Sequence, residues 1–422
     1  MLLQQQIQNI RSLYREYPQQ FWVIVGAGFI DRVGGALIFP FFALYITSHF
    51  EVGMTEVGLM FALFSVADMF GNMIGGALTD FLGRKGMIIM GLVISGMTSL
   101  GMGLVDRLEF FYVMGLISGL FATASGPAHQ AMMTDILPEE KLAEGFGVRR
   151  VTANLAVAIG PAIGGFVASY SYLVLFAADT ITSLITAVIV FLVIKESRPE
   201  QDQESERPSF LKTFAGYREV LKDRTFMAFV VISTVATLVY SQMYSTLSVF
   251  LRDVHGVPEA GYGWLMTLNA GMVVAFQFLI TRKISNRPPM LVMAAGSLLY
   301  VVGFGMYGFS SVYLLFMVAM AVITLGEMVM VPVAEAYVGD AAPEDMRGRY
   351  SGMMGFSWMI PWMIGPLLAG LIMDYGDPNW IWYGSALLGT VAVAGFLALD
   401  IEEQKQHGLP GRWLTAISRR LT

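Results

Sequence analysis

Twelve apolar segments run through this chain, each long enough to cross the roughly 30 Å hydrocarbon core of a bilayer. A backbone inside hydrocarbon must satisfy its own hydrogen bonds, which a helix does. Charged residues make up only 14% of the chain, against about 25% in soluble domains. The sequence therefore predicts an all-α polytopic membrane protein. The expected spans are 21–46, 56–79, 86–105, 110–134, 148–170, 172–194, 226–250, 261–281, 290–309, 311–338, 350–373 and 379–399.

The distribution of Lys and Arg predicts the orientation of the spans. If the N-terminus is cytoplasmic, 23 of the 26 basic residues fall in cytoplasmic segments or, for Arg149 and Arg150, at the cytoplasmic end of the span 148–170. Only Arg107 and Arg252 fall in outside loops, and Arg32 lies within a span. Because cytoplasmic loops carry an excess of Lys and Arg, we expect both termini in the cytoplasm. The expected location is the cell (inner or plasma) membrane.

The two halves of the chain repeat each other. GPAHQAMMTDILPEE (126–140) aligns with VPVAEAYVGDAAPED (331–345), and the same shift carries IGPAIGG (159–165) onto IGPLLAG (364–370). Two six-helix halves with a site near the midplane are typical of secondary transporters. The expected organisation is a cytoplasmic N-terminal segment 1–20, a bundle 21–194, a cytoplasmic linker 195–224 with an amphipathic helix, a second bundle 225–400 and a cytoplasmic amphipathic tail 401–422.

The loop between spans 2 and 3 carries the resemblance to a known family. GALTDFLGRKG (76–86) resembles the G-x-L-x-D-x-x-G-R-[RK] loop of the major facilitator superfamily. The resemblance implies a fold of 12 transmembrane helices in two pseudo-symmetric six-helix bundles. It also implies that the loop is a conformational latch, with Asp135 as a further member. The alternative is that Arg84 and Lys85 only anchor the chain at the cytoplasmic surface. The expected latch residues are Gly76, Asp80, Gly83, Arg84, Lys85 and Asp135.

Span 5 narrows the resemblance within this family. Its pattern G-x8-A-x3-GP-x2-GG begins at Gly147 and is similar to a motif of the 12-helix drug:proton antiporters, with Ala156 for the middle Gly. Proline bends a helix, and glycine lets a neighbouring helix approach closely. The GP pair recurs in span 11, which favours a packing role. The expected helix-bend residues are Gly160, Pro161, Gly164 and Gly165.

Ionisable residues within the spans are candidates for proton coupling, because such residues usually mark substrate or proton routes. Asp31 and Arg32 correspond to Ala236 and Thr237 in the second half, so the duplicated fold does not require them. Arg32 could neutralise Asp68, leaving Asp31 to take up and release a proton. The alternative is a static buried ion pair between spans 1 and 2. The coupling candidates are Asp31, Arg32, Asp68, Asp179 and Glu327.

A second set of polar and aromatic residues is expected to line a substrate cavity. Aromatic faces and a carboxylate together suit lipophilic cations, and methionine adapts to varied ligands. The alternative is that these side chains face lipid or other helices. The candidates are Tyr240, Gln242, Tyr244, Trp264, Asn269, Trp358, Trp362, Glu335 and His129.

These observations favour a secondary active transporter, with proton-coupled efflux of lipophilic or cationic small molecules by alternating access as the leading function. The alternative is a proton-coupled symporter or a lipid or glycolipid flippase with a defined substrate. The sequence contains no nucleophile–base set and no phosphate-binding loop, and it has no Cys and only four His. We therefore expect no enzyme activity, no metal and no cofactor beyond the proton gradient. The expected partners are the small-molecule substrate, protons and the bilayer, without nucleic acid, and the protein is expected to be monomeric.

Overall fold

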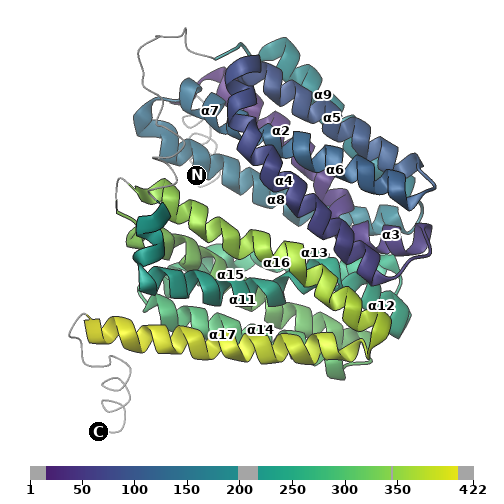
Figure 1. Cartoon of the computed structure of the whole chain (residues 1–422), viewed down its shortest axis with the longest axis vertical. Coiled ribbons are helices and arrows are strands. Elements are labelled where there is room, and N and C mark those ends of the chain that lie inside the picture. Colours follow the sequence, from purple (N-terminus) through teal and green to yellow (C-terminus); the bar gives the residue numbers. More distant parts are fainter. Residues whose placement is uncertain (1–15, 198–216, 344–345, 407–422) are drawn as a thin grey trace, which may run out of the picture. The chain divides into compact units, whose positions relative to one another are not determined.

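The computed structural model describes residues 16–197, 217–343 and 346–406 (Figure 1). Within these ranges, 12 helices are long and apolar enough to cross a membrane. The first of these spans is Gln19–His49 and the last is Trp380–Lys405. The structure therefore confirms the predicted number and order of the spans, and the chain is a multi-pass membrane protein.

Two spans of the first half are interrupted where the sequence has proline. The 3₁₀ turn η1 contains Pro40, whose ring cannot continue the regular hydrogen bonding of α2. Span 4 is likewise divided at Ser125, directly before Gly126 and Pro127. The elements of this half are α2 (Gln19–Ile38), η1 (Phe39–Phe41), α3 (Phe42–His49), α4 (Met54–Leu82), α5 (Arg84–Leu104), α6 (Leu108–Ala124), α7 (Gly126–Ile136), η2 (Glu139–Lys141), α8 (Leu142–Ala168) and α9 (Tyr172–Val193).

The second half begins with a capped helix. The Asp223 carboxylate accepts a 3.0 Å hydrogen bond from the backbone N–H of Phe226, which satisfies a free donor of the first turn of α11. The Tyr350 hydroxyl donates to the same carboxylate and ties α16 to this end of α11. The elements are α11 (Arg224–Ser245), α12 (Leu247–His255), α13 (Glu259–Ile284), α14 (Pro289–Phe309), α15 (Tyr313–Ala341), α16 (Arg347–Tyr375) and α17 (Asn379–Gln406).

The chain divides into two compact units that use the same helix pairs. The described residues of the first unit fall within Met1–Val52, Leu59–Gln203 and Gly256–Ala270, and those of the second within Gly53–Gly58, Glu204–His255 and Gly271–Thr422. In the first unit α2 packs on α8 and α9, and α5 packs on α6 and α9. In the second unit the corresponding spans pair in the same way: α11 with α16 and α17, and α14 with α15 and α17. The repeat seen in the sequence is thus a repeat of packing.

Small residues set the distance between neighbouring helices. Gly71 and Gly75 of α4 lie against the backbone of α6 at Leu120 and Ala124, where a Cβ atom would have no room. Without a hydrophobic force between helices in lipid, such close contacts are a main source of association. Most of the expected linker helix and of the amphipathic tail lies outside the described residues, in 198–216 and 407–422.

Candidate functional site

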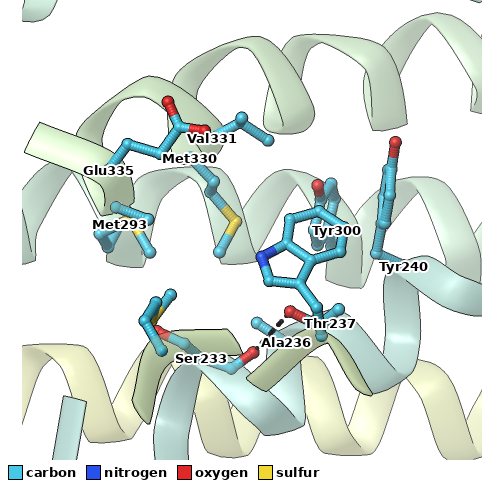
Figure 2. Close-up of a pocket in the computed structure, with 12 residues that line it drawn as sticks. Ser233, Ala236, Thr237, Tyr240, Met293, Tyr300, Met330, Val331 and Glu335 are labelled. Atoms are coloured by element: carbon cyan, nitrogen blue, oxygen red, sulfur yellow. Dashed lines mark hydrogen bonds between the residues drawn. The ribbon is translucent and has the colours of Figure 1, made fainter. Parts of the chain in front are cut away.

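A cavity of about 120 Å³ lies inside the second unit. Helices α11, α14, α15 and α16 supply its wall. Figure 2 shows Tyr240 and Glu335 on opposite sides of this space, with Tyr300 and methionine side chains between them. The lining residues are Ser233, Ala236, Thr237, Tyr240, Met293, Tyr300, Met330, Val331, Ala334, Glu335, Met354 and Trp358.

Aromatic rings form one side of the cavity. The Tyr240 ring stacks on Tyr300, with centroids 5.8 Å apart, and meets Trp358 edge-on at 6.1 Å. Next to them, Tyr244 lies 6.1 Å from Trp362. Offset and edge-on pairs of this kind are favourable beyond their buried area, so they hold the rings in place. The ring faces that line the cavity can receive an apolar or cationic group.

A carboxylate lies directly behind this aromatic side. The Tyr240 hydroxyl donates a 2.9 Å hydrogen bond to Oε1 of Glu327 on α15 and lies 3.4 Å from the Tyr244 hydroxyl. Glu327 does not itself line the cavity. It is connected to the cavity by its hydrogen bond with Tyr240, which does line it. Glu335, eight residues further along α15, does line the cavity. The site therefore combines π faces with two carboxylates and can bind positive charge.

Three methionines give the cavity a soft wall. Met293, Met330 and Met354 come from three different helices. Gly296 leaves room for Met330, whose sulfur also receives a 3.7 Å contact from the Ser297 hydroxyl. Thioether side chains are flexible and polarisable, so such a wall adapts to ligands of different shape.

Two carboxylates of the first unit lie within a hydroxyl-rich packing layer. The Ser183 hydroxyl donates a 2.7 Å hydrogen bond to Oδ1 of Asp31, which directs Asp31 toward α9. Asp179 is buried and hydrogen-bonded by Ser99 of α5. Its carboxylate lies beside Gly34, a position where a Cβ atom would clash. Asp31 and Asp179 are close enough to repel each other when both are ionised.

The loop between α4 and α5 is held by carboxylates. Nε of Arg84 lies 2.9 Å from Oδ2 of Asp135 on α7, and both side chains are largely buried. Glu196, just after α9, accepts hydrogen bonds from the backbone N–H groups of Arg84 and Lys85 at 3.0 and 3.1 Å. It therefore caps the N-terminus of α5, where a negative charge is favourable. Gly83 has φ of 81°, and a Cβ atom there would collide with Glu196.

The comparisons with known proteins agree with this architecture. The family model of the Major Facilitator Superfamily matches residues 24–304 and 242–418. The chain belongs to this superfamily. Its fold is shared by the nucleoside transporter NupG, with a TM-score of 0.74 at 14% identity over 90% of this chain and 99% of that one.

Curated relatives in this superfamily match nearly the whole chain. The Na⁺, Li⁺, K⁺/H⁺ antiporter of Planococcus maritimus is 28% identical, covering 86% of this chain and 91% of that protein. Multidrug resistance protein 2 of Bacillus subtilis is 24% identical, covering 94% and 98%. Quinolone resistance protein NorA of Staphylococcus aureus is 24% identical, covering 89% and 96%.

The structure places some of the predicted cavity residues of this superfamily member in or beside the cavity and others away from it. Tyr240, Trp358 and Glu335 line the cavity, and Tyr244 and Trp362 pack beside it. Gln242 instead accepts a hydrogen bond from Thr246 one turn away and packs against Gly365.

Three further candidates belong to the first unit, so they do not line this cavity. Trp264 is 64% exposed and Asn269 is buried, both in the part of α13 that belongs to the first unit. His129 lies on α7.

Two lining residues, Tyr300 and Met293, lie on the ninth span and were not among the predicted cavity residues. The available signal was weak, because the Tyr300 hydroxyl is one of three in this span, with those of Ser297 and Tyr307.

The pairing of Arg32 with Asp68, which the sequence left possible, is not seen among the described residues. Arg32 is exposed and forms no ion pair with Asp68 there. The Asp68 carboxylate lies against Gly119 of α6 instead. Adjacent residues on α2 point about 100° apart around the helix axis. Because the Asp31 side chain points toward α9, the Arg32 side chain points elsewhere. The remaining coupling candidates therefore separate, with Asp31 and Asp179 in one layer and Glu327 in the second unit.

The helix-bend motif packs as its glycines predict. Gly160 lies against Ala36, and Gly164 against the Leu37 carbonyl, so α8 contacts α2 along this face. Gly165 meets Gly263 in the same unit. Pro161 lies inside α8, which continues as one helix from Leu142 to Ala168.

Two residues of the predicted latch loop remain to be placed. Gly76 has open space around it, and the side chain of Asp80 lies outside the described part.

Replacing Arg84 by Gln is expected to lower the stability of the protein by about 1–3 kcal/mol, because the change leaves the largely buried Asp135 carboxylate without its cation. The measurement is thermal unfolding in detergent. Arg107→Gln is the matched control: its pairing with Glu109 is 68% and 73% exposed, and exposed pairs contribute little. Equal stability of the Arg84 variant and the control would contradict a structural role for the pair.

Proposed function

We propose that this chain is a proton-coupled exporter of lipophilic cations. The cavity of the second unit receives the substrate, and Glu327 is the group that exchanges a proton for substrate charge. The observation that carries the proposal is the 2.9 Å hydrogen bond from the Tyr240 hydroxyl to Glu327 at the aromatic wall of this cavity. Intramembrane acids typically mark such proton and substrate routes.

A single carboxylate can link the two species because each neutralises the same charge. An unprotonated Glu327 attracts a cation held on the faces of Tyr240, Tyr300 and Trp358. A protonated Glu327 offers no charge, so the cation is released and the proton remains. The methionine side of the cavity accepts apolar groups of different shape.

The names of the relatives support this direction of transport. One relative is a multidrug resistance protein and another is a quinolone resistance protein. A third is an antiporter that uses protons. We propose that movement of the two units relative to each other opens the site to alternate sides, and that the Arg84–Asp135 pair acts as a latch in this movement. The cell membrane with both termini cytoplasmic remains our proposed location.

The test uses inside-out vesicles that contain the protein and an imposed pH gradient, acid inside. Ethidium fluorescence reports uptake, and vesicles without the protein are the control. We expect ethidium to accumulate only with the gradient present and to leave when a protonophore collapses it. Gradient-independent flux, or no flux of ethidium and related cations, would contradict the proposal.

A second candidate function is exchange of alkali cations for protons. It is favoured by the Planococcus maritimus relative and by the oxygen-rich layer of Asp31, Asp179, Ser99 and Ser183, since hard cations prefer oxygen ligands. In the same vesicles, NaCl or LiCl should then dissipate the pH gradient, read with a pH-sensitive dye. If Na⁺ dissipated the pH gradient and no ethidium flux were seen, alkali cation/proton exchange would replace lipophilic-cation export as the proposed function.

A further inference from the structure

A proline interrupts the hydrogen bonding of α15 close to the proposed coupling group. Pro332 lies inside this helix, four residues after Met328 and five after Glu327. Proline has no N–H, so it cannot donate the helical hydrogen bond that the Met328 carbonyl would otherwise accept. Met328 is fully buried, and a buried carbonyl without a partner is unfavourable. The turn that carries Glu327 therefore needs a donor from outside the helix.

Gln277 of α13 supplies this donor. Its Nε2 donates a 3.0 Å hydrogen bond to the Met328 carbonyl and a 2.9 Å hydrogen bond to the Thr281 hydroxyl, one turn further along α13. A glutamine amide has two N–H donors, so both are used, and the bond to Thr281 fixes the direction of the side chain. Gln277 and α15 both belong to the second unit.

Two helices thus hold the same turn of α15. The Tyr240 hydroxyl of α11 bonds Glu327 at 2.9 Å, and Gln277 of α13 bonds the carbonyl of the next residue. Met330 and Val331, which follow along the chain, line the cavity (Figure 2). A change in the bend of α15 at the proline therefore displaces the carboxylate from its partner and alters the cavity wall.

The first half of the chain has an amide and a proline at the equivalent positions, but the amide bonds elsewhere. The starts of α4 and α13, and those of α6 and α15, differ by 205 residues (259 minus 54 and 313 minus 108). The same shift aligns Asn72 with Gln277 and Pro127 with Pro332. The shorter Asn72 side chain donates to the Asp68 carbonyl of its own helix, and the span that contains Pro127 is divided into α6 and α7. The span whose proline is bridged by an amide is instead one helix.

We infer that Gln277 is a positioning residue for Glu327: it bonds the carbonyl that Pro332 leaves without its helical donor, and so fixes the bend of α15 and the place of the carboxylate. Gln277 does not line the cavity, so it acts through the backbone of α15. The role of Glu327 rests on the proposed function, whereas the hydrogen bond across the proline can be tested without transport.

The first test is a double-mutant cycle on thermal unfolding in detergent. Gln277→Met keeps the length of the side chain but has no donor, so it should lower Tm by about 2–4 °C. Pro332→Ala gives the Met328 carbonyl its helical N–H donor. In the Pro332→Ala background, Gln277→Met should therefore lower Tm by less than half as much. Equal losses in both backgrounds would overturn the inference, because the amide would then not act on that carbonyl.

Gln242→Met is the matched control for this cycle. Gln242 is a glutamine of the same unit, and its amide donates to the Leu238 carbonyl within its own helix, α11. Its replacement should lower Tm equally with and without Pro332→Ala, since the two changes share no partner. A loss that Pro332→Ala relieves for both glutamines would contradict a specific bond from Gln277.

The second test measures ethidium export against pH in the inside-out vesicles. Gln277→Met should slow export about fivefold, the effect of about one hydrogen bond. It should also move the pH of half-maximal export in the same direction as Tyr240→Phe, because both changes loosen the contact that holds Glu327. The titratable side chains around Glu327 are those of Tyr240, which bonds it, and of Tyr244 and Tyr300, which contact Tyr240.

A purely structural role for Gln277 would lower the amount of folded protein without moving the pH profile. Adding Tyr240→Phe to Gln277→Met should move the profile no further, and adding Pro332→Ala should bring it back toward that of the wild type. An unchanged profile in Gln277→Met would overturn the inference. Absence of ethidium export by the wild type would instead sink the proposed function, and the stability cycle would still decide whether Gln277 acts across the proline.

Discussion

Glu327→Gln is expected to reduce pH-driven export of ethidium by about a hundredfold, which corresponds to about 2.7 kcal/mol. Glutamine keeps the size of the side chain and can still bond to Tyr240, but it can neither take up a proton nor attract a cation. Export should then no longer respond to the pH gradient. The measurement is the initial rate of ethidium accumulation in inside-out vesicles at several internal pH values.

Two further variants separate charge from geometry at this site. Tyr240→Phe removes the hydroxyl that bonds Glu327 and should slow export only several-fold, since one hydrogen bond contributes about 1 kcal/mol. Glu402→Gln changes an exposed acid on α17 and should export at the wild-type rate. If Glu327→Gln kept its full pH-dependent rate, Glu327 would not be the coupling group.

Gly160→Leu is expected to destabilise the first unit. The new side chain would meet the Cβ and backbone of Ala36, in the interface between α2 and α8. Overpacking a close contact usually costs about 1–3 kcal/mol, and here a backbone atom, which cannot move aside, adds to it. We expect a Tm lower by several degrees and a reduced yield of monodisperse protein in detergent.

Gly147→Leu is the matched control, because Gly147 lies in the same helix and the same sequence motif. It is exposed, and nothing lies within 4 Å of an added Cβ. Leucine is also the better helix former by about 0.5–1 kcal/mol, so this variant should be as stable as the wild type. Equal losses in both variants would show that the motif is sensitive to any side chain, and would contradict a specific α2–α8 contact.

Most of the fold could be predicted from sequence. Twelve apolar runs specify twelve helices because a backbone in lipid has no other partner for its hydrogen bonds. The 205-residue repeat (331 minus 126) predicted that the two halves would pack alike, and the helix pairs of both units do. The involvement of Asp135 with the loop was also expected, since the family resemblance implied it as a further latch residue, and the structure pairs it with Arg84.

The direction of individual side chains could not be predicted in the same way. Asp31 and Arg32 are neighbours in sequence, yet the Asp31 carboxylate accepts a hydrogen bond from Ser183 whereas the Arg32 side chain is exposed. Glu196 falls in the predicted cytoplasmic linker 195–224, but in the structure it caps α5. These outcomes depend on the rotation of each helix about its axis, and a shift of one residue turns a side chain by about 100°.

The sequence by itself determined that the chain crosses the membrane twelve times as two similar halves, because hydrophobic length and internal repetition are local properties. Only the tertiary structure decided that Tyr300 of α14 completes the aromatic wall with Tyr240 and Trp358. The same packing placed Trp264 on an exposed surface. Whether an aromatic residue faces a cavity or lipid is set by contacts between helices far apart in the chain, and hydropathy is the same for both.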